Sequence, residues 1–160
     1  MLELTPSQMA RDLAGLPVQH ERRMEQEMTL ERSAVNPVVW SQEMGFNQGE
    51  VVSGETRTLY ISGQTAMSAD GRPEHDGDVA AQLALSVDNL EAVLTAAGMT
   101  LANLVRLNVY TTDIDALFPH YGELAGRLGA AGVAPTTTML EVTRLAIPGQ
   151  LVELEGTAVA

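Results

Sequence analysis

The 160-residue sequence contains no cysteine and no lysine. Without cysteine the chain can form no disulfide, no thiolate nucleophile and no cysteine-ligated zinc or iron–sulfur site. Without lysine it can form no Schiff base with a substrate carbonyl, and it lacks the phosphate-binding lysine of a Walker motif. These absences exclude several classes of enzyme, and they leave the redox compartment open.

Positive charge is also scarce. Nine arginines stand against 21 acidic residues, which gives a formal net charge of −12. Binding to nucleic acid or to an anionic membrane requires a basic surface that neutralises phosphates, so we expect neither partner. The sequence has no apolar run of about 18 residues, as a membrane span requires, and no basic start followed by an apolar segment, as in a signal peptide. We expect a cytoplasmic protein.

The first 35 residues differ from the remainder. They hold four of the nine arginines and few β-branched residues. Thr5–Gln8 is typical of a capping box at the start of a helix, whereas the segment from His20 to Arg32 has few apolar residues to bury. The whole chain is 45% hydrophobic and long enough for one domain. We therefore predict an N-terminal helical extension over 1–35 and one folded domain over 36–160.

Strands and helices alternate along this domain. Strand patterns over 49–54 and 57–64 precede a helix between the N-cap Asp78 and Gly98, whose apolar residues recur every three or four positions. A strand over 104–112, a second helix over about 117–131 and two strands within 134–159 follow, with Pro119 in the first turn of the helix. Two helices can cover only one face of such a sheet. We predict an α+β fold whose second sheet face meets water or another subunit.

Alternate residues of a strand share a face, and three predicted strands carry a polar or mixed face. In the strand over 104–112 this face holds Arg106, Asn108 and Tyr110, opposite Val105, Leu107 and Val109. In the last two strands the sets are Thr137, Met139, Glu141 and Thr143, and then Glu153, Glu155 and Thr157. Mixed surfaces of this kind are typical of a contact between two subunits or of a pocket.

Few residues could perform chemistry. The histidines His20, His75 and His120 are far apart in the sequence, and no pair has the spacing of metal ligands, so we expect no metal site. A carboxylate on a sheet face can transfer protons when it is partly buried, which makes Glu153 and Glu155 candidates. The alternative is that they are exposed charges that protect a strand edge from aggregation.

Three stretches account for most of the chain after the extension. They are LYISGQTA at 59–66, DVAAQLALSVDNLEAVLTAAGMTLANLVRLNVYTTDID at 78–115 and PTTTMLEVTRLAIPGQLVELEGTAVA at 135–160. Together they resemble the reactive intermediate deaminase (Rid, YjgF-type) family. The resemblance implies a chorismate-mutase-like fold, a sheet backed by two helices, with three copies closing into a barrel that has a ligand pocket at each interface. It also implies hydrolysis of enamines and imines to ketones and ammonia without a cofactor.

The same resemblance assigns roles to individual residues. Ser62 and Gly63 match the SGQ turn that shapes the pocket, and Glu153 matches the glutamate that orients the attacking water. Phe46 occupies the place of a usual pocket tyrosine, so the ring is kept and the hydroxyl is lost. These assignments make Glu153 the expected catalytic residue.

Two positions depart from the family pattern. Met139 stands where a small residue, often cysteine, supplies a backbone carbonyl. Thr137 stands where an arginine pairs with the substrate carboxylate, and a threonine cannot make the two charge-assisted hydrogen bonds of a guanidinium. The resemblance therefore implies a similar pocket with a changed substrate.

Two functions remain open at this point. The first is a homotrimeric enzyme that hydrolyses a reactive imine, enamine or related small molecule with altered specificity. The second is a non-catalytic homotrimer that binds a metabolite in the same inter-subunit pockets. A ribonuclease activity, which is sometimes attributed to this family, is disfavoured by the net charge of −12.

Overall fold

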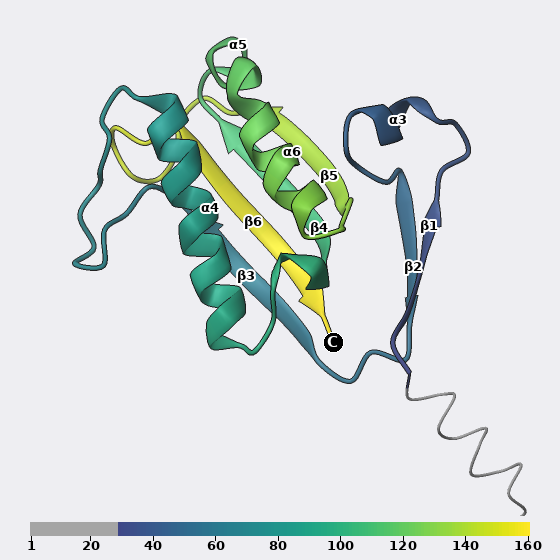
Figure 1. Cartoon of the computed structure of the whole chain (residues 1–160). Coiled ribbons are helices and arrows are strands. Elements are labelled where there is room, and N and C mark those ends of the chain that lie inside the picture. Colours follow the sequence, from purple (N-terminus) through teal and green to yellow (C-terminus); the bar gives the residue numbers. More distant parts are fainter. Residues whose placement is uncertain (1–28) are drawn as a thin grey trace, which may run out of the picture.

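The computed structural model describes residues 29–160 and contains a two-stranded hairpin and a four-stranded sheet packed against helices (Figure 1). The hairpin region comprises β1 (Glu31–Val35), α3 (Trp40–Glu43) and β2 (Gly49–Ser53). The main unit comprises β3 (Thr58–Gln64), α4 (Val79–Ala96), β4 (Leu104–Thr111), α5 (Ile114–Leu117), α6 (Tyr121–Ala130), β5 (Thr136–Glu141) and β6 (Val152–Val159). Two short 3-10 turns, η1 (Leu101–Asn103) and η2 (Phe118–His120), precede β4 and α6. The predicted order of strands and helices from β2 onward is confirmed.

The strands of the larger sheet are ordered β3-β6-β4-β5. β6 is antiparallel to both β3 and β4, whereas β4 and β5 are parallel. Figure 1 shows α4 and α6 side by side on one face of this sheet, with no helix of the described residues on the other. The predicted α+β fold, a sheet backed by two helices, is confirmed.

Helix α4 forms where the sequence predicts it. The Asp78 side chain accepts a hydrogen bond from the Ala81 amide at 3.0 Å, and Gly98 adopts the left-handed conformation (φ 70°) that ends the helix. Its apolar face packs against the sheet through four buried residues, Leu83, Val87, Leu90 and Leu94. In the part of the chain that the structure describes, no helix is long and apolar enough to cross a membrane.

The single second helix predicted over about 117–131 is wrong at its start. The segment begins earlier, because the Asp113 side chain accepts a hydrogen bond from the Ala116 amide at 2.9 Å and caps α5. Pro119 then lies in η2 and divides the segment, since proline has no N–H to donate to a helical hydrogen bond. α6 resumes at Tyr121, and its first turn lies close to the hairpin region, because Tyr121 lines a cavity together with residues 42–45.

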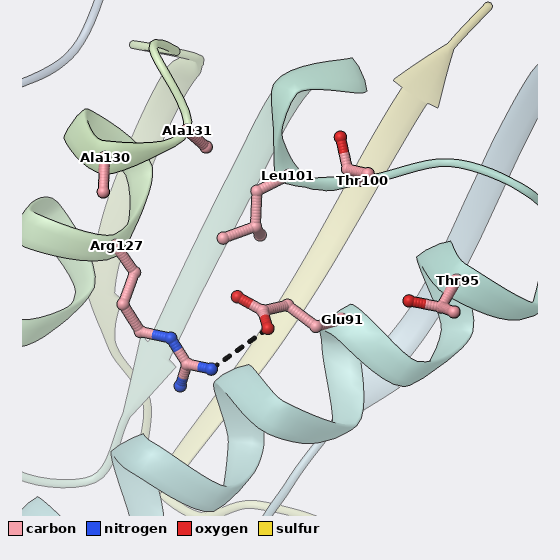
Figure 2. Close-up of a pocket in the computed structure, with 7 residues that line it drawn as sticks. All are labelled: Glu91, Thr95, Thr100, Leu101, Arg127, Ala130 and Ala131. Carbon is pink, nitrogen blue, oxygen red and sulfur yellow. Dashed lines mark hydrogen bonds and ion pairs between the residues drawn. The ribbon is translucent and has the colours of Figure 1, made fainter.

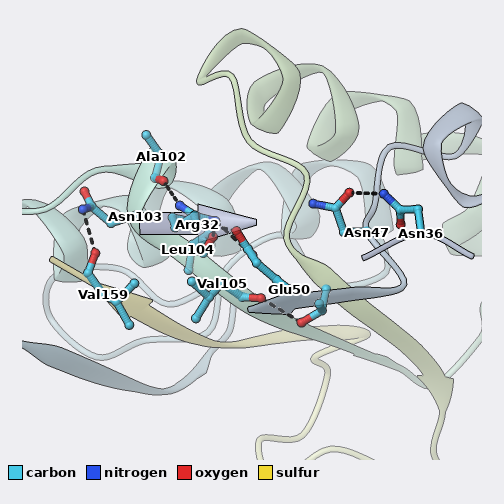
Figure 3. A network of polar contacts seen from close by, with 10 residues as sticks. Arg32, Asn36, Asn47, Glu50, Ala102, Asn103, Leu104, Val105 and Val159 are labelled. Carbon is cyan, nitrogen blue, oxygen red and sulfur yellow. Dashed lines mark hydrogen bonds and ion pairs between the residues drawn. The ribbon is translucent and has the colours of Figure 1, made fainter. Parts of the chain in front are cut away.

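The helical extension predicted over 1–35 is wrong for residues 31–35. These residues form β1, which is antiparallel to β2. The extended backbone places Arg32 diagonally opposite Glu50, where its guanidinium binds both carboxylate oxygens at 2.6 and 3.1 Å. Arg32 also donates to the carbonyls of Ala102 and Leu104, which ties the hairpin to the start of β4 (Figure 3). The prediction for residues 1–28 lies outside the described residues.

The two faces of β4 follow the predicted alternation with one correction. Leu107 and Val109 are fully buried beneath the helices, as predicted. The strand pairing shifts between Leu104 and Arg106, and such a bulge restarts the alternation. Leu104 is therefore buried in place of Val105, which is only half-buried.

Candidate functional site

The SGQ turn meets Glu153 near the β3 edge of the sheet. The pairing of β3 with β6 shifts between Ile61 and Gln64, and a methyl group added to Gly63 would lie 1.7 Å from Glu153 Oε1. The carboxylate thus occupies the space that any other residue at position 63 would fill. Glu153 pairs in register with Tyr110, not with a core residue of β4, so it lies on the face that the helices leave open.

Side chains from distant elements fix the segment that follows this turn. Asn89 of α4 donates to two carbonyls of residues 65–67, at 2.9 and 3.0 Å. The buried Gln150 accepts a hydrogen bond from the Ala66 amide at 2.7 Å. Ser62, which lies just before the supported segment, is exposed. A site held by such packed and hydrogen-bonded neighbours keeps its geometry.

Thr137 and Met139 lie on the opposite face of the sheet. Their register partners in β4 are Leu107 and Val109, which are both fully buried under the helices. Paired residues of neighbouring strands share a face. Thr137 and Met139 therefore point to the helix-covered side, on the edge strand β5.

Phe46 joins Thr137 and Met139 in lining a cavity of about 270 Å³ at this edge. The structure thus brings together three of the predicted substrate-binding residues. The cavity has four further lining residues that the sequence analysis missed: Trp40, Met44, Phe118 and Tyr121. One signal for them was available, because the only tryptophan precedes Phe46 by six positions and two rings occur three positions apart at the start of a helix.

The predicted site is therefore divided between the two edges of one sheet. Glu153 and Gly63 lie on the open face near β3, and Thr137 lies on the covered face of β5. In the order β3-β6-β4-β5, strand β4 lies between β6, which carries Glu153, and the edge strand β5, which carries Thr137. Within one chain, Glu153 lies against Gly63 but does not meet Phe46, Thr137 or Met139.

The open face carries a polar network beside Glu153. The Tyr110 hydroxyl donates to the Glu155 carboxylate at 2.8 Å, and Arg106 donates to the Thr138 hydroxyl at 2.7 Å. The hydrogen bond to Glu155, with smaller contributions from burial and from the charge of that carboxylate, raises the pKa of Tyr110. This face is thus polar and internally hydrogen-bonded rather than an apolar core surface.

Other cavities lie away from these residues. A cavity of about 470 Å³ lies between α4 and α6. Figure 2 shows the residues that line it, Glu91, Thr95, Thr100, Leu101, Arg127, Ala130 and Ala131. Its one guanidinium binds Asp88 and Glu91 at 2.7 and 3.1 Å. Arg144 lines another cavity, of about 390 Å³, with Thr112 and residues 145–150. Neither arginine joins Thr137 in its cavity.

The predicted absence of a metal site concerns three histidines. His75 lies in the loop before α4 and His120 in η2, while His20 falls outside the described residues. Within residues 29–160, no three His, Asp or Glu side chains gather closely enough to hold a metal ion. The chemistry that the site offers on the described residues is that of the Glu153 carboxylate.

Known proteins resemble this chain over most of its length. Protein DfrA of Myxococcus xanthus is 32% identical over 105 residues, which are 65% of this chain and 77% of that protein. The RutC family protein YjgH of Escherichia coli is 34% identical over 88 residues, or 55% of this chain and 66% of that protein. A solved structure of the Rid family protein YyfB from Yersinia pestis matches with a TM-score of 0.73 at 31% identity, over 81% of this chain and 98% of that one.

The sequence model of a protein family also matches. It is described as Endoribonuclease L-PSP, and it spans residues 41–160, which include both edges of the sheet and every predicted site residue. This range is more than half of the chain, and the structural match to a Rid family protein agrees with it. The chain therefore belongs to the Endoribonuclease L-PSP family, the YjgF or Rid group.

Proposed function

We propose that this protein hydrolyses a reactive imine or enamine to a carbonyl compound and ammonia, in pockets formed between neighbouring copies of a homotrimer. One observation carries the proposal: Glu153 Oε1 occupies space that is open only because Gly63 has no side chain, and this close contact positions the carboxylate. Its expected partners line a cavity at the opposite edge of the sheet. A second copy of the chain would supply the missing half at each edge, and closed symmetric assemblies use one surface repeatedly in this way.

The reaction needs one proton-transfer group. The reacting form is the protonated imine, which an enamine gives when its carbon is protonated. Glu153 accepts a proton from a water molecule as the water oxygen bonds to the imine carbon and the C=N electron pair moves to nitrogen, which gives a neutral carbinolamine. The carboxylic acid then returns this proton to the nitrogen, and the C–N bond breaks as ammonia leaves and the carbonyl forms. The hydroxyl proton passes back to the Glu153 carboxylate and leaves with ammonia as ammonium, which restores Glu153. General acid–base catalysis of this kind contributes roughly 10²–10⁴-fold to a rate.

The open face of the sheet and the net charge of the protein indicate its other partners. The open face, with Tyr60 at 80% exposure, gives three copies a surface on which to close into a barrel. A net charge of −12 opposes binding to RNA phosphates, although the family is named after an endoribonuclease. We therefore include a small-molecule substrate, no nucleic acid or membrane partner, no cofactor and a cytoplasmic location in the proposal.

The test combines turnover with assembly state. Imines and enamines made in situ from a panel of amines and amino acids should disappear faster with the protein than without it, as followed by loss of trapping with semicarbazide. Glu153→Gln should lower this rate by roughly 10²–10⁴-fold, while Glu155→Gln, on the same strand face, should keep it within a few-fold. If a correctly assembled trimer turns over nothing in the panel, the non-catalytic binding function replaces this proposal. If light scattering finds a stable monomer, the proposed pocket between subunits is contradicted.

A further inference from the structure

Four of the six aromatic side chains of the protein converge on the cavity at the β5 edge. They are Trp40, Phe46, Phe118 and Tyr121. Trp40 and Phe118 remain 54% exposed, although only 4% of the residues are aromatic. Large exposed apolar side chains gathered in one place mark an interaction site. Their concentration here indicates what the cavity binds.

The rings come from two separate parts of the fold. Trp40 in α3 and Phe46 in the turn behind it meet edge to face, with centroids 5.6 Å apart and planes at 77°. Phe118 in η2 and Tyr121 in α6 stack with centroids 6.4 Å apart and planes at 9°. All four rings line one cavity of about 270 Å³. Aromatic ligands gain from both kinds of contact, and the volume suits a single ring with a short chain.

Thr137 presents a hydrogen-bond acceptor to this cavity. The Thr137 hydroxyl donates its proton to the Pro135 carbonyl at 3.0 Å. A hydroxyl has one proton and two lone pairs, so Thr137 can accept a hydrogen bond from a ligand but has no proton left to donate. The other lining side chains are Met44, Met139 and the four rings, and none of these seven residues within 29–160 is charged. A carboxylate would find no cation there, and its only side-chain donors would be the neutral Tyr121 hydroxyl and the Trp40 indole N–H.

We infer that the substrate is an imine of an arylalkyl amine, with an aromatic ring and no carboxylate. This inference rests on the proposed hydrolysis and names the substrate class of the same pocket. The ring lies among the four aromatic side chains, and the protonated imine N–H faces the lone pairs of Thr137. A cation near ring faces is stabilised by their quadrupoles, and the net charge of −12 attracts cations to the protein.

The chemistry also limits where the substrate comes from. An imine without a carboxylate forms when an amine loses two electrons and two protons to an oxidant, not when an amino acid undergoes elimination. Addition of water and loss of ammonia then give an aryl-substituted aldehyde or ketone. The reaction that supplies this protein is therefore an amine oxidation.

Trp40 provides a direct test of binding, because it is the only tryptophan in the chain. Phenethylamine, a stable cationic analogue, should change Trp40 fluorescence saturably in the full-length assembled protein. It should bind at least about tenfold more tightly than phenylacetate, which has the same ring and the opposite charge. Phe118→Leu should weaken phenethylamine binding several-fold. The control Val39→Ala, in an exposed residue that does not line the cavity, should leave it unchanged.

An exchange of charge sharpens the test. Thr137→Arg should reverse the preference, so that phenylacetate binds more tightly than phenethylamine. If phenethylamine gives no Trp40 response in the assembled wild-type protein, or if phenylacetate binds more tightly, the inference is overturned whatever the catalytic result.

Turnover separates this inference from the function on which it rests. The wild-type protein should hydrolyse the imine of oxidised phenethylamine at least about tenfold more efficiently than 2-aminoacrylate, which carries a carboxylate. The reverse order would overturn the aromatic assignment and leave imine hydrolysis intact. Hydrolysis of neither, together with a saturable Trp40 response to phenethylamine, would overturn the hydrolase proposal and support aromatic recognition by a binding protein.

Discussion

The two edges of the sheet are built from different chemistry. At the β3 edge, a carboxylate lies against bare backbone at Gly63, and the amide side chains of Gln150 and Asn89 hold the adjoining segment. At the β5 edge, the cavity is apolar and aromatic, and two of its rings are about half exposed. The first arrangement suits a reaction that depends on the position of one group. The second suits recognition by shape and ring contacts. Because β4 separates β5 from β6, we expect substitutions on β5 to change which substrate binds while the Glu153 carboxylate on β6 keeps its position.

Mixing two damaged chains would test most strongly whether the edges of different copies cooperate. Glu153→Gln removes the carboxylate, and Thr137→Tyr fills the cavity with a ring, so each variant alone should lose at least about 10²-fold in activity. Coexpression in equal amounts should restore about a quarter of wild-type activity, because that share of interfaces in a ring receives one intact edge from each neighbour. The measurement is imine hydrolysis by the purified mixture.

The control for this experiment mixes the same two variants after separate assembly, without exchange of subunits. That mixture should stay inactive. Activity that stays at background in verified mixed trimers would contradict a pocket shared between copies.

A change at Gly63 would break the β3 edge alone. Gly63→Ala brings a methyl group into the position of Glu153 Oε1, and the flexible carboxylate must move aside. Misplacement by about 1 Å costs on the order of 10²-fold in rate, so we expect kcat to fall roughly 10- to 100-fold. The free energy of unfolding should change by less than about 1 kcal/mol, because a mobile side chain yields rather than the backbone. Kinetics and urea denaturation of the same samples measure both quantities.

Gly126→Ala is the matched control, since a methyl group there meets nothing within 4 Å and the position lies within α6. It should leave kcat unchanged and stabilise the protein by about 0.5–1 kcal/mol through helix propensity. If kcat is unchanged in Gly63→Ala, the close contact between Gly63 and the Glu153 carboxylate is not needed for the reaction.

Most of the sheet could be predicted because its signals are local. Asp78 and Gly98 mark the ends of α4, and the alternation of Leu107 and Val109 identifies the buried face of β4. Val105 was assigned to the wrong side because a bulge depends on the partner strand. Likewise, β1 could not be predicted, since it depends on a bond between Arg32 and a residue 18 positions away.

The candidate site was only partly predictable for the same reason. The contact between Glu153 and Gly63 agrees with the roles that the family resemblance assigns to the SGQ and VELE motifs. The separation of Glu153 from Thr137 follows from the strand order, which alternation along one strand does not reveal. The aromatic cavity joins Trp40 to Phe118, 78 positions apart in sequence and on elements that no local pattern relates.

Loss of Arg32 would loosen the β5 edge and leave the β3 edge in place. The hairpin that Arg32 ties to β4 carries Trp40 and Phe46. Arg32→Ala leaves the Glu50 side chain, 6% exposed, without its cation, which should cost about 3 kcal/mol of stability. We expect KM for an aryl imine to rise by about tenfold, with kcat nearly unchanged, because ground-state binding is weakened.

Arg57→Ala serves as the control for this change. The Arg57 guanidinium makes a single exposed hydrogen bond, to the Ala97 carbonyl at 3.2 Å, so stability and KM should barely change. A fall in kcat as large as the rise in KM in Arg32→Ala would mean that the hairpin also positions the carboxylate edge.

The smallest expected effect is a change in the pKa of a tyrosine, which should occur at Tyr110 on the open face of the sheet and not at Tyr121 on the covered side. The pKa of Tyr110 is raised chiefly by its hydrogen bond to the Glu155 carboxylate on the open face, whereas burial beside the aromatic cavity raises the pKa of Tyr121. Glu155→Gln should therefore lower the pKa of Tyr110 toward 10.0, the ordinary value, and leave that of Tyr121 where it is. Tyrosinate absorbance, with Tyr110→Phe and Tyr121→Phe to assign the steps, measures both. Because each pKa is higher in the folded protein, the associated stabilisation is complete below pH 10 and is lost as the pH rises through the folded pKa. If the pKa of Tyr110 is the same in Glu155→Gln as in the wild-type protein, the hydrogen bond between Tyr110 and Glu155 on the open face is contradicted.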